Sequence, residues 1–214
     1  LLLYGARRTL SLAFFAVVAR VLVGTVLGAL SGWFPDSLLD RALMGLNQVI
    51  AAFPSLLLAM VMIYAFGIRQ GLWVFALALC LVGWGEVAQS VRGYVMSIRE
   101  QDYVEGALAV GLGDLQLLTR HVLPNLVPSL VVLACLEMGG VLMTLGELGF
   151  IGVFIGGGMS VATVTDSVAT YFDVPEWGVM LSSSWRSCRR QPWMTFFPAL
   201  AFSLAILGFN LFGE

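Results

Sequence analysis

Four charged residues lie inside otherwise apolar segments, and they are the side chains best placed to do chemistry. They are Arg20, Glu86, Glu137 and Glu147. A charge is costly in hydrocarbon, so such residues pair with one another or line a path for ions or substrate. Two interpretations stay open: an interior ion pair of Arg20 with Glu137 or Glu147, and an ion path through these groups.

Catalytic and metal chemistry have few candidates. The chain has one histidine, His121, and its three cysteines (Cys80, Cys135 and Cys188) are too scattered for a structural zinc site or a disulfide framework. Neither G-x-S-x-G nor H-E-x-x-H occurs. All 11 cations are arginine, so the lysine of a P-loop ATPase is missing and no basic patch suits nucleic acid. We expect no catalytic residue, no metal site and no nucleic-acid partner.

The segment 97–124 is rich in charge and has the pattern of a helix-turn-helix. Ser97 and Glu100 have the spacing of a capping box, which predicts a helix start at Ser97. The apolar positions form one stripe: Tyr103, Val104, Ala107, Leu108 and Gly111. Periodicity alone indicates an amphipathic connector on the membrane surface.

The second half of this segment contains three structural signals. Gly111 is predicted to end the first helix in the left-handed conformation. Asp114 is predicted to cap a second short helix, and Pro124 is predicted to end it and open the next span.

The composition indicates an integral membrane protein. Of the 214 residues, 59% are apolar and 11% charged, whereas soluble domains carry about 25% charged residues, and the mean hydropathy is +0.93. A helix needs about 20 apolar residues to cross a membrane, and membrane-spanning strands are not expected because no alternating pattern recurs. Five helical spans are predicted: 10–34, 42–67, 71–91, 125–154 and 191–213.

Residues 1–214 are expected to form a single transmembrane domain that is truncated at both ends, with at least one more span upstream and a short tail downstream. Gly24, Gly28 and Gly32 recur at four-residue spacing, and small residues at this spacing let helices approach closely. We expect these glycines to pack against a partner span. Pro54 is expected to kink the second span.

The arginines argue weakly against placing segment 97–124 in the cytoplasm, because cytoplasmic loops usually hold the excess of positive charge. With this segment inside, the inside arginines are Arg41, Arg92, Arg99 and Arg120. The outside arginines are then Arg7, Arg8, Arg69, Arg186, Arg189 and Arg190.

Part of the segment resembles the cytoplasmic signature of the bacterial binding-protein-dependent ABC importer permeases. That signature is Glu-Ala-Ala, three residues, Gly, nine residues, Ile, any residue and Leu-Pro. The matching residues are Glu105, Gly106, Ala107, Gly111, His121, Leu123 and Pro124. The spacing holds throughout, with Gly106 in place of the first Ala and His121 in place of Ile.

Other segments resemble the dipeptide, oligopeptide and nickel branch of that family, in the same order along the chain. They are YGAR at 4–7, AFPSLLLA at 52–59, GW at 83–84, VRG at 91–93, RHVLPN at 120–125, PEWG at 175–178, PW at 192–193 and FNL at 209–211.

The resemblance implies an all-α polytopic bundle of the type I ABC importer permease kind, with six spans in the full protein, in the bacterial cytoplasmic (inner) membrane. It implies transport of peptides, nickel or a similar small solute by alternating access. The implied partners are a second permease subunit in a heterodimer, two ATP-binding subunits that carry ATP and Mg, an extracytoplasmic substrate-binding protein, and membrane lipid. The chain itself would bind no cofactor and hydrolyse no ATP.

Within this family, segment 97–124 would be the cytoplasmic coupling loop, with Asp114 and Arg120 among its residues and Glu105 paired with an arginine of the loop or the ATPase. Segment 156–191 would be the external loop. The alternative is a secondary transporter or channel with Arg20, Glu137 and Glu147 as an ion path. That alternative does not explain the spacing from Glu105 to Pro124.

Overall fold

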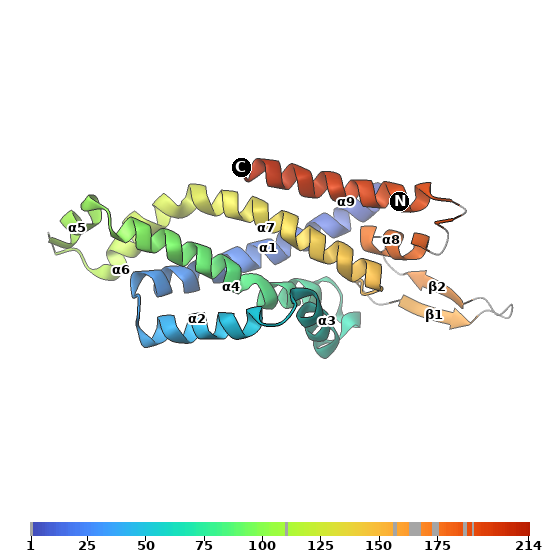
Figure 1. Ribbon diagram of the computed structural model, residues 1–214, viewed down its shortest axis with the longest axis horizontal. Coiled ribbons are helices and arrows are strands. Elements are labelled where there is room, and N and C mark those ends of the chain that lie inside the picture. The colour runs from blue at the N-terminus through green and yellow to red at the C-terminus, as the bar shows by residue number, and fades with distance from the viewer. Residues whose placement is uncertain are drawn as a thin grey trace.

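The computed structural model describes residues 2–109, 111–155, 158–162, 168–172, 176–185, 188–189 and 191–214, which form an elongated helical bundle (Figure 1). The elements are α1 (Leu2–Trp33), α2 (Leu38–Ala51), α3 (Ser55–Phe66), the 3₁₀-helix η1 (Ile68–Gln70), α4 (Leu72–Arg99), α5 (Asp102–Ala109), α6 (Asp114–Leu117), the π-helix η2 (Leu118–Val122), α7 (Leu123–Ile151), β1 (Gly158–Ala162), β2 (Val168–Phe172), α8 (Trp177–Trp185) and α9 (Trp193–Phe212). Pro175, Arg186 and Arg190 lie outside the described residues, as do the side chains of Arg69 and Leu108.

Four helical stretches within the described ranges are long and apolar enough to cross a membrane. They are α1, α4, the continuous stretch Asp114–Ile151 and α9. They confirm the first, third, fourth and fifth predicted spans. The first, third and fourth helices continue past the apolar runs into polar sequence, because helical hydrogen bonding does not stop where hydrophobicity does.

The second predicted span is two helices rather than one. α2 and α3 meet at an angle of 95°, and Pro54 occupies the N-cap position of α3. Proline disfavours the helical conformation in the residue before it, so the chain leaves the helix at 52–53 and restarts at Ser55. The kink expected at Pro54 is therefore a full break.

The α1 glycines lie at the closest approach of α1 to α4. A Cβ atom on Gly24 would lie 2.5 Å from Cγ1 of Val87, and one on Gly32 would lie 2.7 Å from the carbonyl oxygen of Arg92. At Gly28 it would meet the carbonyl oxygen of Ala88. The span that faces these glycines is thus α4 of the same chain, and a larger side chain would separate the two helices.

The two ends of the bundle carry different structures. α5 and α6 lie at one end, and β1, β2 and α8 lie at the other (Figure 1). β1 and β2 pair antiparallel, with Gly158 opposite Phe172 and Ala162 opposite Val168. The two strands have five residues each and belong to the loop segment 156–191. The hairpin is therefore compatible with the expectation that no strand crosses the membrane.

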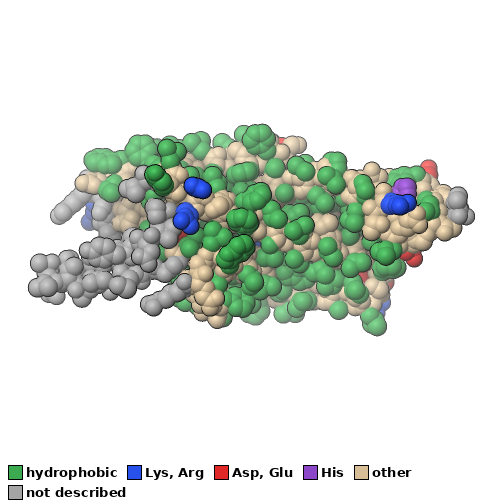
Figure 2. Space-filling view, turned by 180° about the vertical axis from the view of Figure 1, so that it is seen from behind, with side chains coloured by type: hydrophobic (Ala, Val, Ile, Leu, Met, Phe, Trp, Pro, Cys, Tyr) green, Lys and Arg blue, Asp and Glu red, His purple; other side chains and the backbone are tan. Residues whose placement is uncertain are grey.

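The exterior between the ends is apolar. Figure 2 shows hydrophobic side chains over the long middle of the molecule and charged side chains gathered toward its ends. Exposed apolar residues of this kind are the contact surface that lipid or partner helices require. The molecule is a polytopic α-helical membrane bundle, as predicted.

Candidate functional site

The start of the loop helix differs from the prediction. α4 continues through Ser97 to Arg99, and α5 begins at Asp102. The amide N–H groups of Val104 and Glu105 donate to the carbonyl oxygen of Gln101, at 2.9 and 3.3 Å. The capping box expected at Ser97 and Glu100 is therefore wrong, because both residues lie at the carboxyl end of a longer transmembrane helix.

The end of α5 confirms the role predicted for Gly111 in the backbone. Gly111 has a φ of 90°, a conformation that costs a residue with a Cβ atom about 1–2 kcal/mol. The amide of Leu112 donates to the carbonyl oxygen of Ala107 at 3.2 Å, which is the long hydrogen bond of a Schellman motif. Gly111 therefore fixes the turn between the two halves of the loop.

The second half of the loop is helical from Asp114 onward without interruption. Gly113 is the N-cap of α6, and no side chain caps it, so the expected cap at Asp114 is wrong and Asp114 is the first helical residue. Pro124 does not end the helix either. It lies in the first turn of α7, directly after the π-helical turn η2. Proline has no amide N–H to donate, and the wider π-helical turn lets the helix continue past it.

The loop is packed firmly onto the end of the bundle. Four of its apolar side chains are buried: Val104, Leu117, Leu118 and Val122. They form one cluster with Trp33 of α1 and Val95 of α4. Two polar contacts add to it, because the amide of Asn125 donates to the Tyr103 hydroxyl at 3.0 Å and the Arg99 guanidinium lies 5.9 Å from the Trp33 ring. Close packing of this kind lets the loop and the spans move as one body.

The signature residues lie mainly on the outward face of this loop. Glu105, Gly106, Gly111, Asp114, Arg120, His121 and Pro124 are exposed, and Ala107 and Leu123 are half-buried. A Cβ atom on Gly106 would meet nothing within 4 Å, so the absence of alanine there leaves no packing gap. The loop thus presents a polar, firmly supported surface at the end of the molecule.

The interior charges form one ion pair. Arg20 of α1 contacts Glu137 of α7 with 2.9 Å between its Nη1 and the glutamate Oε2, and its Nε–H donates to the Leu79 carbonyl of α4 at 2.7 Å. Arg20 therefore joins three helices. Glu147 does not join them, because it is exposed further along α7 in an apolar groove beside Phe202.

A second charged contact was not anticipated from the sequence. Asp40 of α2 is buried and accepts from Arg92 of α4 through both oxygens, at 2.8 and 2.9 Å. It also contacts the Ser31 hydroxyl of α1, and the Ser37 hydroxyl accepts from the Asp40 amide at 3.1 Å. Only the spacing of Ser37 and Asp40, typical of a helix start, could have pointed to Asp40.

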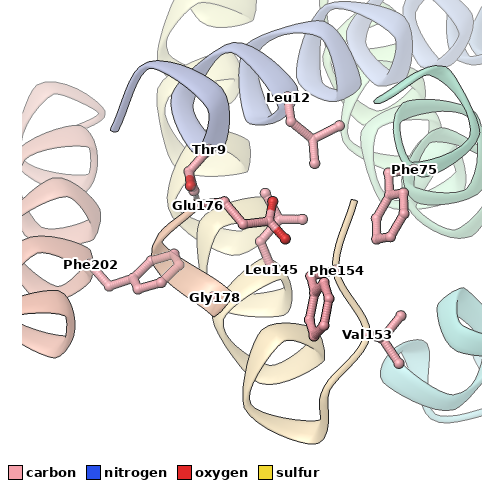
Figure 3. A pocket seen from close by; sticks show the side chains of 9 residues that line it. All are labelled: Thr9, Leu12, Phe75, Leu145, Val153, Phe154, Glu176, Gly178 and Phe202. Carbon is pink, nitrogen blue, oxygen red and sulfur yellow. The ribbon is translucent and has the colours of Figure 1, made fainter. Parts of the chain in front are cut away.

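A buried carboxylate also lies at the opposite end of the molecule. Glu176 precedes α8 and accepts from the amide of Ile155 at 3.0 Å, and its carboxyl group is surrounded by side chains that include Leu145 and Phe154 (Figure 3). Burial raises the pKa of Glu176 to about 7. The next residue, Trp177, donates its amide to the Thr9 hydroxyl at 3.2 Å, so this corner ties α8 to α1.

Metal ligands are not clustered in the part of the chain that the structure describes. No three His, Cys, Asp or Glu side chains there are placed to hold one ion, and Cys80, Cys135 and Cys188 are free thiols.

The fold and the signature loop together define a membrane protein of the type I ABC importer permease class. Residues 24–214 match the family of binding-protein-dependent transport system inner membrane components. The chain belongs to this family and is an inner-membrane protein.

Relatives of this chain include named peptide permeases. It is 31% identical over 213 residues to the dipeptide transport system permease protein DppC of Alkalihalophilus pseudofirmus, covering all of this chain and 64% of that protein. It is also 31% identical to the glutathione transport system permease protein GsiD of Pectobacterium atrosepticum, covering 100% of this chain and 65% of the relative. For the oligopeptide transport system permease protein OppC of Haemophilus influenzae the identity is 26%, with 98% and 62% covered. The chain thus spans just under two thirds of these relatives.

The fold also matches a solved transporter. A chain of the inward-facing MetNI methionine ABC transporter superposes with a TM-score of 0.74 at 16% identity, covering 98% of this chain and 91% of that one. At this identity the likeness concerns the fold.

Proposed function

We propose that this chain is the transmembrane permease subunit of an ATP-driven importer that moves peptides or a similar small solute inward by alternating access. The chain itself binds no cofactor and hydrolyses no ATP. ATP and Mg belong to two separate ATPase subunits, and a second permease subunit and an extracytoplasmic binding protein complete the assembly. The named relatives are dipeptide, glutathione and oligopeptide permeases, which supports a substrate of this class.

One observation carries this proposal, namely the combination of an exposed signature face with a buried support in segment 97–124. Glu105, Arg120 and His121 face outward, while Val104 and Leu117 anchor the loop in the bundle core. A surface that docks an ATPase must transmit a displacement to the spans, and a two-state element of this kind is what long-range coupling requires. In this proposal, segment 97–124 is cytoplasmic and segment 156–191 is external.

The secondary-transporter alternative has weaker support. An ion path would need a chain of ionisable groups, but Arg20 and Glu137 neutralise each other at 2.9 Å, and Glu147 is exposed elsewhere on α7.

Charge reversal at Glu105 tests the proposal. We expect Glu105→Lys, in the full protein reconstituted with its partner subunits, to reduce ATP-dependent peptide uptake at least tenfold, because an attractive contact with the ATPase becomes repulsive. The matched control is Glu100→Lys, which reverses another exposed charge outside the signature and should retain uptake. Wild-type uptake by Glu105→Lys with normal ATPase association would contradict the coupling role.

A further inference from the structure

A polar cavity opens into the middle of the bundle, between α1, α3, α4 and α7. It has a cavity volume of about 230 Å³ and is open on one side. Five polar side chains line it, namely Arg20, Ser55, Glu86, Glu137 and Thr144. Ligand sites in helical bundles are built in this way, from a few convergent polar groups in an apolar setting.

The charges of this cavity lie within the predicted spans. Glu137 is at the midpoint of the 29-residue α7, and at about 1.5 Å per residue it is roughly 20 Å from either end of that helix. Glu86 lies one helical turn after Gly83, which faces Arg20. Because α4 extends beyond its apolar run, Glu86 lies midway between the centre and one end of the predicted span 71–91, but it is still inside a hydrocarbon core about 30 Å thick.

Only one of the two carboxylates is compensated. Glu137 is paired with Arg20 at 2.9 Å. Glu86 is exposed, and among the side chains that the structure describes no cation lies within 4 Å of it. A lone carboxylate at this depth is expensive, so a cation that enters the cavity gains a strong partner.

The α3 side of the cavity offers donors for an anion. Ser55 is the first residue of α3, and the N-cap of that helix, Pro54, provides no side-chain cap. The N–H groups of a first helical turn lack partners within the helix, and with the Ser55 hydroxyl they suit a carboxylate. The cavity therefore combines one carboxylate outside an ion pair with donors that have no partner within their own helix.

We propose that this cavity is a mid-membrane binding site for a zwitterionic substrate, with its protonated amine on Glu86 and its carboxylate at Ser55 and the first turn of α3. The ligand class is a short peptide or amino acid with a free amino group. An ammonium group has three donors and fits a carboxylate, and the neighbouring Arg20–Glu137 pair keeps a second negative charge from competing. This site rests on the proposed importer function and gives the translocation path a defined stopping point.

Binding measurements on the complete importer in nanodiscs, without the binding protein, test this site. The probes are dialanine, which has a free amine, and N-acetyl-dialanine, which has none. The variants are Glu86→Gln and, as a matched control, Glu147→Gln, which changes an exposed carboxylate of α7 outside the cavity.

We expect Glu86→Gln to weaken dialanine binding at least tenfold, the loss expected when a charge-assisted hydrogen bond is removed, and Glu147→Gln to leave it unchanged. N-acetyl-dialanine should bind the wild type as weakly as dialanine binds Glu86→Gln. Equal dialanine affinity in wild type and Glu86→Gln overturns the site, as does undetectable binding to the wild type. Loss of the second permease subunit in Glu86→Gln also overturns it, because Glu86 then serves the subunit interface.

A separate readout distinguishes this site from the importer function. ATP-dependent uptake by the wild type in proteoliposomes tests the importer function alone. If the wild type shows ATP-dependent uptake but Glu86→Gln does not change dialanine binding, only the proposed site is contradicted. If the wild type shows no ATP-dependent uptake, the proposed importer function is contradicted.

Discussion

Gly83 of α4 leaves the space through which the Arg20 side chain of α1 reaches Glu137 of α7. A Cβ atom at this position would overlap the Arg20 guanidinium, which is held by Leu79 and Glu137. A guanidinium that moves aside gives up the geometry of its contacts with Leu79 and Glu137, and a buried charge without its partner is strongly destabilising.

We expect Gly83→Ala to lower the free energy of unfolding by about 2–4 kcal/mol, because it displaces a buried arginine from its partner. Thermal unfolding of the detergent-solubilised protein measures the change. Gly93→Ala is the control on the same helix, since a Cβ atom there meets nothing within 4 Å and alanine favours a helix by up to about 1 kcal/mol. Equal melting temperatures for the two variants would show that the guanidinium relaxes freely.

At the residue scale, the sequence identified Arg20 and Glu137 as interior charges. Glu86 and Glu147 are exposed instead, and the buried carboxylates Asp40 and Glu176 were not anticipated. Arg20 was expected to pair with Glu137 or Glu147, and which of the two faces α1 depends on the rotation of α7 about its axis. The contact between Asp40 and Arg92 joins residues separated by 52 positions. No local pattern encodes such a contact, because it arises from the angle at which α2 returns to α4.

The turn at Gly111 is the element on which the shape of the coupling loop depends. We expect Gly111→Ser to destabilise α5 by about 1–2 kcal/mol, because serine disfavours the positive φ. ATP-dependent uptake should fall while assembly with the ATPases persists, and hydrogen exchange of the α5 amides should accelerate.

Gly113→Ser is the matched control for that turn. Gly113 has a φ of −72° at the N-cap of α6, where serine is a preferred residue, and its Cβ position is open. We expect this variant to keep wild-type uptake and exchange. If both serine variants behave alike, the left-handed turn has no special role.

The corner between α8 and α1 is expected to respond to pH. The pKa of Glu176 is raised from 4.5 to about 7 by burial. Between these two values the unfolded chain has lost the proton and the folded chain retains it, so stability falls as pH rises through this window, by about 3 kcal/mol in total. Glu176→Gln should therefore be more stable than wild type at pH 8 and should lose this dependence.

Melting temperatures between pH 4 and 8 measure the Glu176 effect. The control Glu100→Gln alters an exposed carboxylate and should keep the wild-type pH profile. Parallel profiles for Glu176→Gln and wild type would mean that the Glu176 carboxyl is hydrated in the folded protein.

At the element scale, predictions succeeded where the backbone alone decides and failed where a neighbouring element intervenes. Gly111 was predicted correctly because positive φ is a local property of glycine. The helix start at Ser97 was wrong because α4 continues to Arg99, and the extra turns pack on Trp33 and Val104. The break at Pro54 exceeded the expected kink, because the 95° bend also depends on α2 being held by Arg92 through Asp40.

For the whole molecule, hydropathy predicted four of the spans and their order, whereas the second predicted span is the bent pair of α2 and α3. The spacing of the residues from Glu105 to Pro124 predicted the family. The short hairpin at Gly158–Phe172 was not predicted, because segment 156–191 was interpreted as a polar loop from its Gly, Ser and Thr content. Its second strand, VATYF, nevertheless consists largely of residues that favour strands. The shape of the bundle does not show which of its ends faces the cytoplasm. The distribution of arginines argues weakly against a cytoplasmic segment 97–124.

Sidedness labelling decides this orientation. Single cysteines introduced by Gln116→Cys and Gln191→Cys, in a background lacking Cys80, Cys135 and Cys188, lie at exposed positions in segments 97–124 and 156–191. We expect an impermeant maleimide to label Gln116→Cys only in inverted vesicles and Gln191→Cys only in intact spheroplasts, because only a cytoplasmic loop can reach an ATPase. Labelling after denaturation is the control for thiol reactivity. The reverse pattern would place the signature face outside, where no ATP-driven partner could engage Glu105.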